Sequence, residues 1–126
     1  MPLCATLGIE ALEVGADEVQ LSMGWDPGRC TIGGALHGGA IMTLADAAGA
    51  AVASLNLPEG SVGTSTVESK TNFLGGVTSG AVVATARPLH VGTTTIVVET
   101  WVHWDDRLIA KVTQTQVVLR PRPAPA

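Results

Sequence analysis

The segment from Leu36 to Leu57, LHGGAIMTLADAAGAAVASLNL, places one carboxylate in a run of glycine, alanine and apolar residues. The run has the composition of a helix, and Asp46 lies about two and a half turns after His37 at about 3.6 residues per turn. A partly desolvated carboxylate in such a setting is suited to act as a general base or as a nucleophile. Asp46 is therefore the first candidate for a catalytic residue.

Helical periodicity separates Asp46 from the face that we expect to enter the core. At about 100° per residue, one apolar stripe contains Ile41, Leu44, Ala45, Ala48, Val52 and Leu55. A second face combines Asp46 with small residues, which are Gly39, Thr43, Ala50 and Ala53. Small side chains let another backbone approach closely, so this face predicts a narrow seam. A surface carboxylate on an alanine-rich helix is the alternative.

The glycine-rich stretch before the helix, Gly33-Gly34-Ala35-Leu36-His37-Gly38-Gly39, predicts a loop that turns into a helix start. Unpaired N–H groups and the helix dipole favour negative charge there, such as an oxyanion on a thioester carbonyl. A tight loop whose glycines only permit turns is the alternative. The sequence has no GxGxxG or Walker pattern, so we do not expect a nucleotide phosphate cradle.

Length and charge limit the classes of protein to consider. With 126 residues, the chain suits one domain with a hydrophobic core and is too short for two ordinary ones. We expect this domain over residues 1–120 and a loose Pro-rich tail over residues 121–126, since RPRPAPA cannot join the interior of a sheet. The net charge of −4, with seven scattered basic residues, argues against nucleic acid as a partner.

The N-terminus and the long helix predict a protein of the cytoplasm. The first residues, MPLCATLGIEALE, have no basic start and reach Glu10 too early for a signal peptide. The helix is weakly hydrophobic and interrupted by Asp46, so we do not expect it to span a membrane. Cys4 and Cys30 lack a CxxC pattern and suit reduced thiols.

Cysteine and histidine are the other side-chain types that could carry chemistry. Cys30 precedes His37 and is an alternative nucleophile, but the sequence offers it no evident local base. The three histidines, His37, His90 and His103, have no metal-ligand spacing with one another or with the cysteines. We therefore expect neither a metal nor another cofactor.

Most of the remaining chain has the period of two that is typical of strands. The expected strands are Leu7–Val14, Glu18–Trp25, Ser61–Leu74, Gly80–Arg87, Thr93–Trp104 and Leu108–Leu119. The first two could also be one bent strand, and Pro88 should stop the fourth. Strict alternation in the third puts Val67, Ser69, Thr71 and Phe73 on one face and Thr66, Glu68, Lys70 and Asn72 on the other.

This element order predicts an α+β protein in which an antiparallel sheet wraps one long helix. One sheet has a single face to offer the apolar stripe of the helix. The small face with Asp46 then needs a second subunit, and the mean hydropathy of +0.36 also suggests buried subunit contacts.

Two strings, LHGGAIMTLAD and TVESKTNFL, resemble the hotdog-fold acyl-CoA thioesterases of the phenylacetic-acid-pathway type (PaaI-like), relatives of the 4-hydroxybenzoyl-CoA thioesterases. The resemblance covers roughly Leu7 to Leu119, and the spacing from HGG to the Asp is its most specific part. It implies a hotdog fold, an antiparallel sheet wrapped around one long central helix. It also implies homodimers or homotetramers with active sites between subunits and hydrolysis of an acyl-CoA to a free acid and coenzyme A.

The resemblance implies roles for individual positions. Asp46 matches the catalytic carboxylate, a general base or nucleophile, and His37 precedes Gly38 in the signature. Gly38 matches the glycine whose N–H polarises the thioester carbonyl. Thr66 matches a Ser or Thr that holds the attacking water or the carboxylate.

The implied substrate contacts are less complete. Gly39, Thr31 and Thr43 are expected beside the substrate, although relatives often carry Asn where this chain has Thr31. Relatives also often carry a basic residue where this chain has Thr93. The candidates for the phosphates of coenzyme A are Arg29, Lys70, Arg87, Arg120 and Arg122.

Two other functions stay open at this stage. A hotdog hydratase or dehydratase for enoyl-CoA would need an Asp and a His in one short segment, and no His follows Asp46 closely. A non-catalytic acyl-CoA binding module would keep the glycines but would have no need for a desolvated carboxylate.

Overall fold

One sheet of six antiparallel strands curves around one long helix in the computed structural model, which describes residues 1–126. The elements, in chain order, are α1 (Pro2–Thr6), β1 (Ile9–Val14), β2 (Val19–Gly24), the 3-10 turn η1 (Pro27–Arg29), α2 (Gly38–Ser54), β3 (Gly63–Phe73), β4 (Ala81–Val91), β5 (Thr95–Trp104) and β6 (Arg107–Leu119). The predicted α+β class is confirmed.

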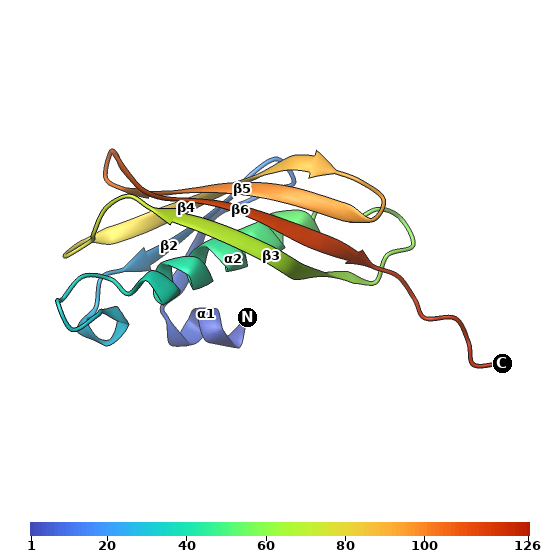
Figure 1. The fold of residues 1–126 in the computed structure, drawn as a ribbon, viewed down its shortest axis with the longest axis horizontal. Helices are drawn as coiled ribbons and strands as arrows, with labels where there is room; N and C mark the ends of the chain where they lie inside the picture. The colour runs from blue at the N-terminus through green and yellow to red at the C-terminus, as the bar shows by residue number, and fades with distance from the viewer.

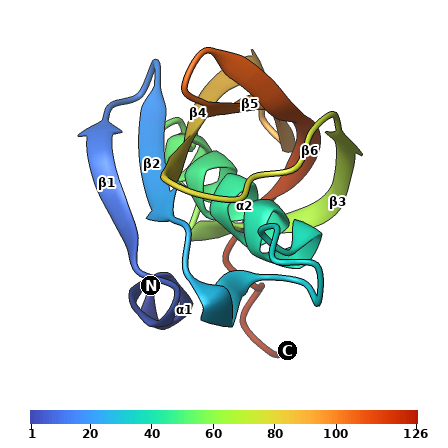
Figure 2. The same ribbon diagram turned by 90° about the vertical axis from the view of Figure 1, so that its left-hand side faces the viewer.

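The strand order in the sheet is β1-β2-β4-β5-β6-β3, so β1 and β3 are its two edges. Seen along the helix, the sheet surrounds α2 on three sides (Figure 2). From the side, β3 and β6 cross in front of α2, and α1 lies beneath it (Figure 1). This arrangement is the expected hotdog fold.

The helix α2 is buried along most of its length because its apolar residues fill the concave side of the sheet. Its buried residues are Ile41, Leu44, Ala45, Ala47, Ala48, Gly49, Val52 and Ala53. The predicted stripe is confirmed except at Leu55, which lies just past the helix end and is 48% exposed. Ala53, predicted on the second face with Asp46, is instead fully buried.

The alternation predicted for β3 is wrong because the strand contains a bulge. Thr66 pairs with Gln116, and Glu68 pairs with the preceding residue of β6, Thr115, so Val67 is an extra residue. A bulge shifts the side-chain alternation by one position. Thr66 and Ser69 therefore both face α2, whereas Val67 is 61% exposed.

Pro88 does not stop β4, contrary to the prediction. The strand continues to Val91, with an irregularity between Pro88 and His90. Because β2 pairs with β4 only as far as Ala86, β4 has a single neighbour at Pro88. A proline is tolerated where one edge of a strand is free and at a bulge.

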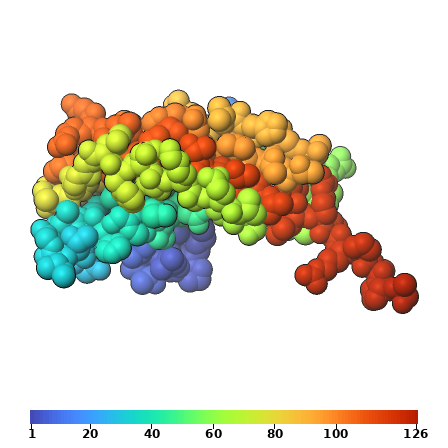
Figure 3. Space-filling model, in the orientation of Figure 1, coloured from blue at the N-terminus to red at the C-terminus, as the bar shows by residue number.

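The two ends of the chain differ in how they meet this fold. The N-terminal residues form the short helix α1, which the sequence pattern did not predict, and β1 and β2 are two separate strands. The residues after Leu119 have no regular structure and extend away from the body (Figure 3). Neither helix combines the length and the apolarity that crossing a membrane requires.

The burial of α2 predicts a contrast between two leucines. Leu44 is fully buried, so Leu44→Ala should lower the free energy of unfolding by about 2–5 kcal/mol. The matched variant Leu55→Ala should cost less than about 1 kcal/mol because Leu55 is half exposed. Urea unfolding at fixed protein concentration measures both values. Equal losses in the two variants would contradict the observed stripe.

Candidate active site

The carboxylate of Asp46 lies where α2 passes under β3 and β6. Its Oδ1 accepts hydrogen bonds from Thr66 Oγ1 at 2.8 Å and from Gln114 Nε2 at 3.3 Å, and its Oδ2 has no partner in the chain. Asp46 is half-buried, so it is neither locked in the core nor fully solvated. One oxygen is therefore held, and the other is available to water or a substrate.

The bulge in β3 brings a second polar side chain to the same face as Thr66. With unbroken alternation through Val67, Thr66 and Ser69 are three residues apart and would point to opposite faces of the sheet. The structure instead brings Thr66 onto Asp46 and puts Ser69 beside the same carboxylate. The resemblance singled out Thr66, and the structure places its hydroxyl within hydrogen-bonding distance of the candidate base.

A cleft of about 380 Å³ opens beside Asp46. Its lining residues are Leu3, Gly39, Met42, Thr43, Asp46 and Ser69. Two of the predicted substrate contacts, Gly39 and Thr43, therefore lie beside the carboxylate, and Thr43 Oγ1 donates to the Gly39 carbonyl at 2.8 Å. Thr31 is exposed in the loop before α2 and does not line this cleft.

The start of α2 is capped by a histidine. His37 Nδ1 accepts a hydrogen bond from the Gly39 N–H at 2.8 Å, so the Gly39 amide is already used. The Gly38 N–H has no acceptor in the chain. A Cβ at Gly38 would lie 3.0 Å from Phe73 Cζ, so glycine lets the Phe73 ring approach the helix start. Gly38 thus presents a free donor.

Asp46 and Gly38 of one chain do not meet. They are eight residues apart on the same helix, which separates them by about 12 Å at about 1.5 Å per residue. Suppose that the carbonyl oxygen of a substrate accepted a hydrogen bond from the Gly38 N–H. A water molecule bound to Asp46 of the same chain would then be too far away to attack that carbonyl group, because each of these contacts spans only about 3 Å. Within one chain, the Asp46 carboxylate and the Gly38 N–H therefore cannot act on the same carbonyl group.

A second cleft, of about 320 Å³, lies at the start of α2. Its lining residues are Leu3, Leu7, Gly28, Arg29, Cys30, His37, Gly39, Ala40 and Thr43. Arg29 is the one predicted phosphate contact that borders it, and its Nη1 donates to the Gly24 carbonyl at 2.7 Å. The Sγ of Cys30 donates to the Asp26 carbonyl at 3.2 Å, which supplies no base for a nucleophile.

The other basic candidates lie away from both clefts. Arg87 pairs with Glu18, and Arg120 donates to the carbonyls of Glu59 and Thr93. Lys70 and Arg122 are exposed and make no ion pair.

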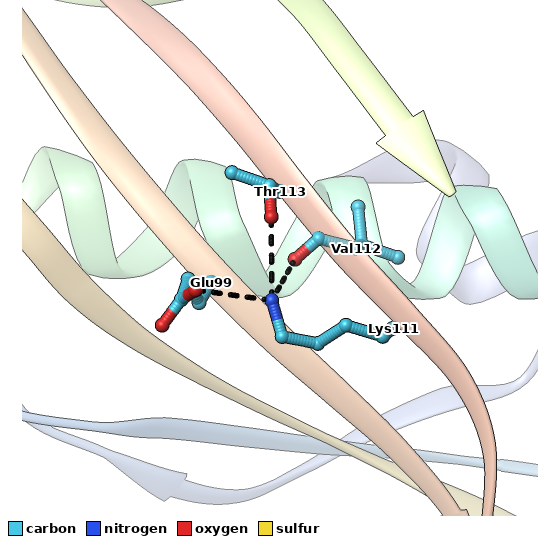
Figure 4. Close-up of polar contacts among 4 residues, drawn as sticks. All are labelled: Glu99, Lys111, Val112 and Thr113. Atoms are coloured by element: carbon cyan, nitrogen blue, oxygen red, sulfur yellow. Dashed lines mark hydrogen bonds and ion pairs between the residues drawn. The ribbon is translucent and has the colours of Figure 1, made fainter. Parts of the chain in front are cut away.

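A cluster around Lys111 lies on the face of the sheet opposite α2 (Figure 4). Its Nζ donates to Glu99 Oε1 at 3.2 Å and to Thr113 Oγ1 at 3.2 Å, and it stands over the ring of Trp101. The sheet separates this cluster from Asp46. Trp101 is therefore outside the Asp46 cleft.

Sequence reasoning missed two buried residues of the site, Gln114 and Gln116. Both are fully buried on β6 beside Thr66 and Asp46. The segment KVTQTQVVL carries a signal for them, because alternation puts these glutamines on the same face as Val112 and Val118. No group of three or more His, Cys, Asp or Glu side chains could hold a metal ion.

Comparison with known proteins identifies the family of this chain. Residues 33–113 match the family model of the Thioesterase superfamily. ComA2 of Bacillus subtilis (strain 168), provisionally named an esterase, is 37% identical over 95 residues, 75% of each chain.

Solved structures share the fold closely. A provisionally named esterase from Mycobacterium tuberculosis has a TM-score of 0.92 at 26% identity, covering 98% of this chain and 100% of that one. Thioesterase HI1161 of Haemophilus influenzae has a TM-score of 0.87 at 29% identity, covering 94% and 82%. The phenylacetic acid degradation protein PaaI of Thermus thermophilus, at 22% identity, has the same fold with a TM-score of 0.87 over 94% and 100%.

A six-stranded antiparallel sheet wrapped around one long helix defines the hotdog fold. Within that fold class, this chain belongs to the Thioesterase superfamily. The predicted family resemblance is confirmed, and membership supports thioester hydrolysis in general.

The capping role of His37 can be tested by two substitutions. His37→Ala removes the acceptor for the Gly39 N–H and should lower the free energy of unfolding by about 1 kcal/mol. His37→Asn supplies another side-chain acceptor and should recover most of that loss. Thermal and urea unfolding compare the three proteins. A loss in His37→Asn as large as in His37→Ala would show that the imidazole stabilises the loop in another way.

Proposed function

We propose that this protein hydrolyses acyl-CoA thioesters to a free carboxylic acid and coenzyme A. The observation that supports it best is the state of Asp46, with Oδ1 held by Thr66 and Gln114 and Oδ2 without a partner. The cleft beside Asp46 has Leu3 and Met42 in its lining, which suits the apolar part of an acyl group.

In this mechanism Asp46 Oδ2 takes a proton from water as the water oxygen attacks the thioester carbonyl carbon. The carbonyl oxygen becomes an oxyanion that accepts a hydrogen bond from the Gly38 N–H. The tetrahedral intermediate then collapses, the C–S bond breaks, and the proton on Asp46 passes to the leaving thiolate. If Oδ2 attacks the carbon directly, a mixed anhydride forms first and water then hydrolyses it.

The proposed site lies between two copies of the chain. Because Asp46 and Gly38 of one helix are about 12 Å apart, one copy supplies the carboxylate and the other the amide. The strand β3 is a free edge of the sheet and can pair with β3 of a second copy in one continuous sheet. We therefore propose a homodimer, alone or as half of a homotetramer.

Asp46→Asn tests the role of the carboxylate. The amide keeps the shape but cannot take a proton, so kcat should fall by about 10²- to 10⁴-fold. Release of free thiol from a panel of aryl, short-chain and medium-chain acyl-CoA thioesters measures the rate. Parental turnover by a folded Asp46→Asn protein would refute the proposed function. Tight acyl-CoA binding without turnover by the parent protein would show a binding module instead.

The donor role of Gly38 can be isolated with a matched pair of variants. Gly38→Pro removes the N–H at a helix position that accepts proline, after a residue with an extended backbone, φ −64° and ψ 133°. It should lower kcat by about 10²- to 10³-fold. Gly38→Ala adds a Cβ against Phe73 but keeps the N–H, so it should retain more of the activity. If both variants lost kcat equally, the loss would come from the added carbon atoms against Phe73 and not from the missing N–H.

The same variants test whether the site is shared between chains. When Asp46→Asn and Gly38→Pro chains are co-expressed in equal amounts, mixed dimers contain one intact site each. Random pairing should restore about a quarter of the parental activity in a two-fold symmetric dimer. Activity no higher than that of either variant alone would place both groups in one chain.

A further inference from the structure

Two glutamine side chains are fully buried beside the candidate base. Gln114 and Gln116 have no exposed surface, and their neighbours on the same face of β6, Val112 and Val118, belong to the hydrophobic core. Burying an amide is costly unless its donor and acceptor find partners. An apolar residue could fill either position without the free-energy cost of burying an amide. Packing alone therefore does not account for the two glutamines.

Gln116 sets the direction of a chain of hydrogen bonds that ends on Asp46. Thr64 Oγ1 is 3.0 Å from Gln116 Oε1, and Gln116 Nε2 donates to Thr66 Oγ1 at 2.6 Å. Because an amide N–H occupies a lone pair of the Thr66 oxygen, the single hydroxyl proton of Thr66 is free to point elsewhere. It points to Asp46 Oδ1 at 2.8 Å.

Gln114 reaches the same carboxylate oxygen directly. Its Nε2 donates to Asp46 Oδ1 at 3.3 Å, and its Oε1 is buried without a partner. An ionised carboxylate can only accept, so the donor half of the amide must face Asp46. Gly49 of α2 makes room for this amide, because a Cβ there would overlap it.

We propose that Gln114 and Gln116 are positioning residues for Asp46, an inference that rests on the proposed thioester hydrolysis. Gln116 acts through Thr66, and Gln114 acts on the carboxylate itself. With Thr66 and Gln114 both donating to Oδ1, the plane of the carboxylate is fixed. Oδ2 is then the oxygen presented to water or to the thioester. Neither glutamine contacts the substrate in this account.

A positioning role and a structural role have opposite consequences for stability. The unpartnered Oε1 of Gln114 makes the native protein less stable than an apolar residue of similar shape would. Gln114→Met should therefore leave the midpoint of thermal unfolding unchanged or raise it, while the loss of the donor lowers kcat. A residue kept for folding alone would show a lower midpoint and an unchanged kcat in the folded protein.

The test compares Gln114→Met and Gln116→Met with the parent, using the acyl-CoA that the parent hydrolyses fastest. Each variant should lower kcat by about ten- to a hundred-fold, because a small misplacement of a catalytic group has effects of this size, with little change in KM. Gln20→Met is the matched control, since Gln20 is half-buried on β2 and donates to Glu18. It should keep the parental kcat.

A double-mutant cycle tests the route through Thr66. Thr66→Val removes the hydroxyl, so adding Gln116→Met to it should cause no further loss of kcat, whereas independent effects would multiply. Multiplied losses would overturn the proposed route from Gln116.

The outcomes separate this inference from the proposed function. If Asp46→Asn abolishes turnover but folded Gln114→Met and Gln116→Met proteins keep the parental kcat, the positioning role is refuted and the hydrolysis stands. If Asp46→Asn keeps its turnover, the proposed function itself fails. Should one glutamine variant not fold, the other decides. Gly49→Ala provides a second perturbation of Gln114, because it displaces the amide without changing it and should also lower kcat.

Discussion

The carboxylate of Asp46 is held on one oxygen by hydrogen-bond donors that lie in an otherwise apolar core. The donors come from two neighbouring strands, Thr66 on β3 and Gln114 on β6. Several local irregularities surround these contacts. The bulge at Val67 puts Ser69 on the same inner face as Thr66, and Gly49 leaves the space that the Gln114 amide occupies. Irregularities of strand register, helix composition and core polarity thus meet at one carboxylate.

The composition of α2 reflects two demands on the same helix. Its buried face is covered by the sheet, and tertiary packing of that face is what stabilises most helices in proteins. Alanine satisfies this demand at no conformational cost, whereas glycine is unfavourable in a helix by about 1 kcal/mol. Each of the three glycines of α2 lies where a neighbour comes very close, and for two of them the neighbour comes from the sheet, Phe73 at Gly38 and Gln114 at Gly49. Close approach therefore outweighs helix propensity at these two positions.

The sequence was sufficient to predict the elements whose signal is local. The helix, its core stripe and the unusual Asp46 follow from periodicity, and the family resemblance pointed to Gly38 and Thr66. The bulge at Val67 could not be predicted, because register depends on the partner strand and not on β3 alone. Pro88 was misjudged for a related reason, since a proline in a strand is harmless where only one edge is paired. The glutamines of β6 were visible in the alternation, but their contact with Asp46 depends on how the strand crosses the helix.

The length of the helix explains why the proposed site needs two chains. A carboxylate and an amide separated by about 12 Å along one rigid helix cannot approach one carbonyl group. The edge strand β3 takes part both in holding Asp46 and in the proposed pairing of two chains. It carries Thr66 on its inner face and leaves its outer edge unpaired. A second copy that pairs along β3 would meet the sheet at the strand that already orients the carboxylate. In such an assembly, the strand that holds Asp46 in place is also the strand that brings the partner chain, so orientation of the base and completion of the site depend on the same element.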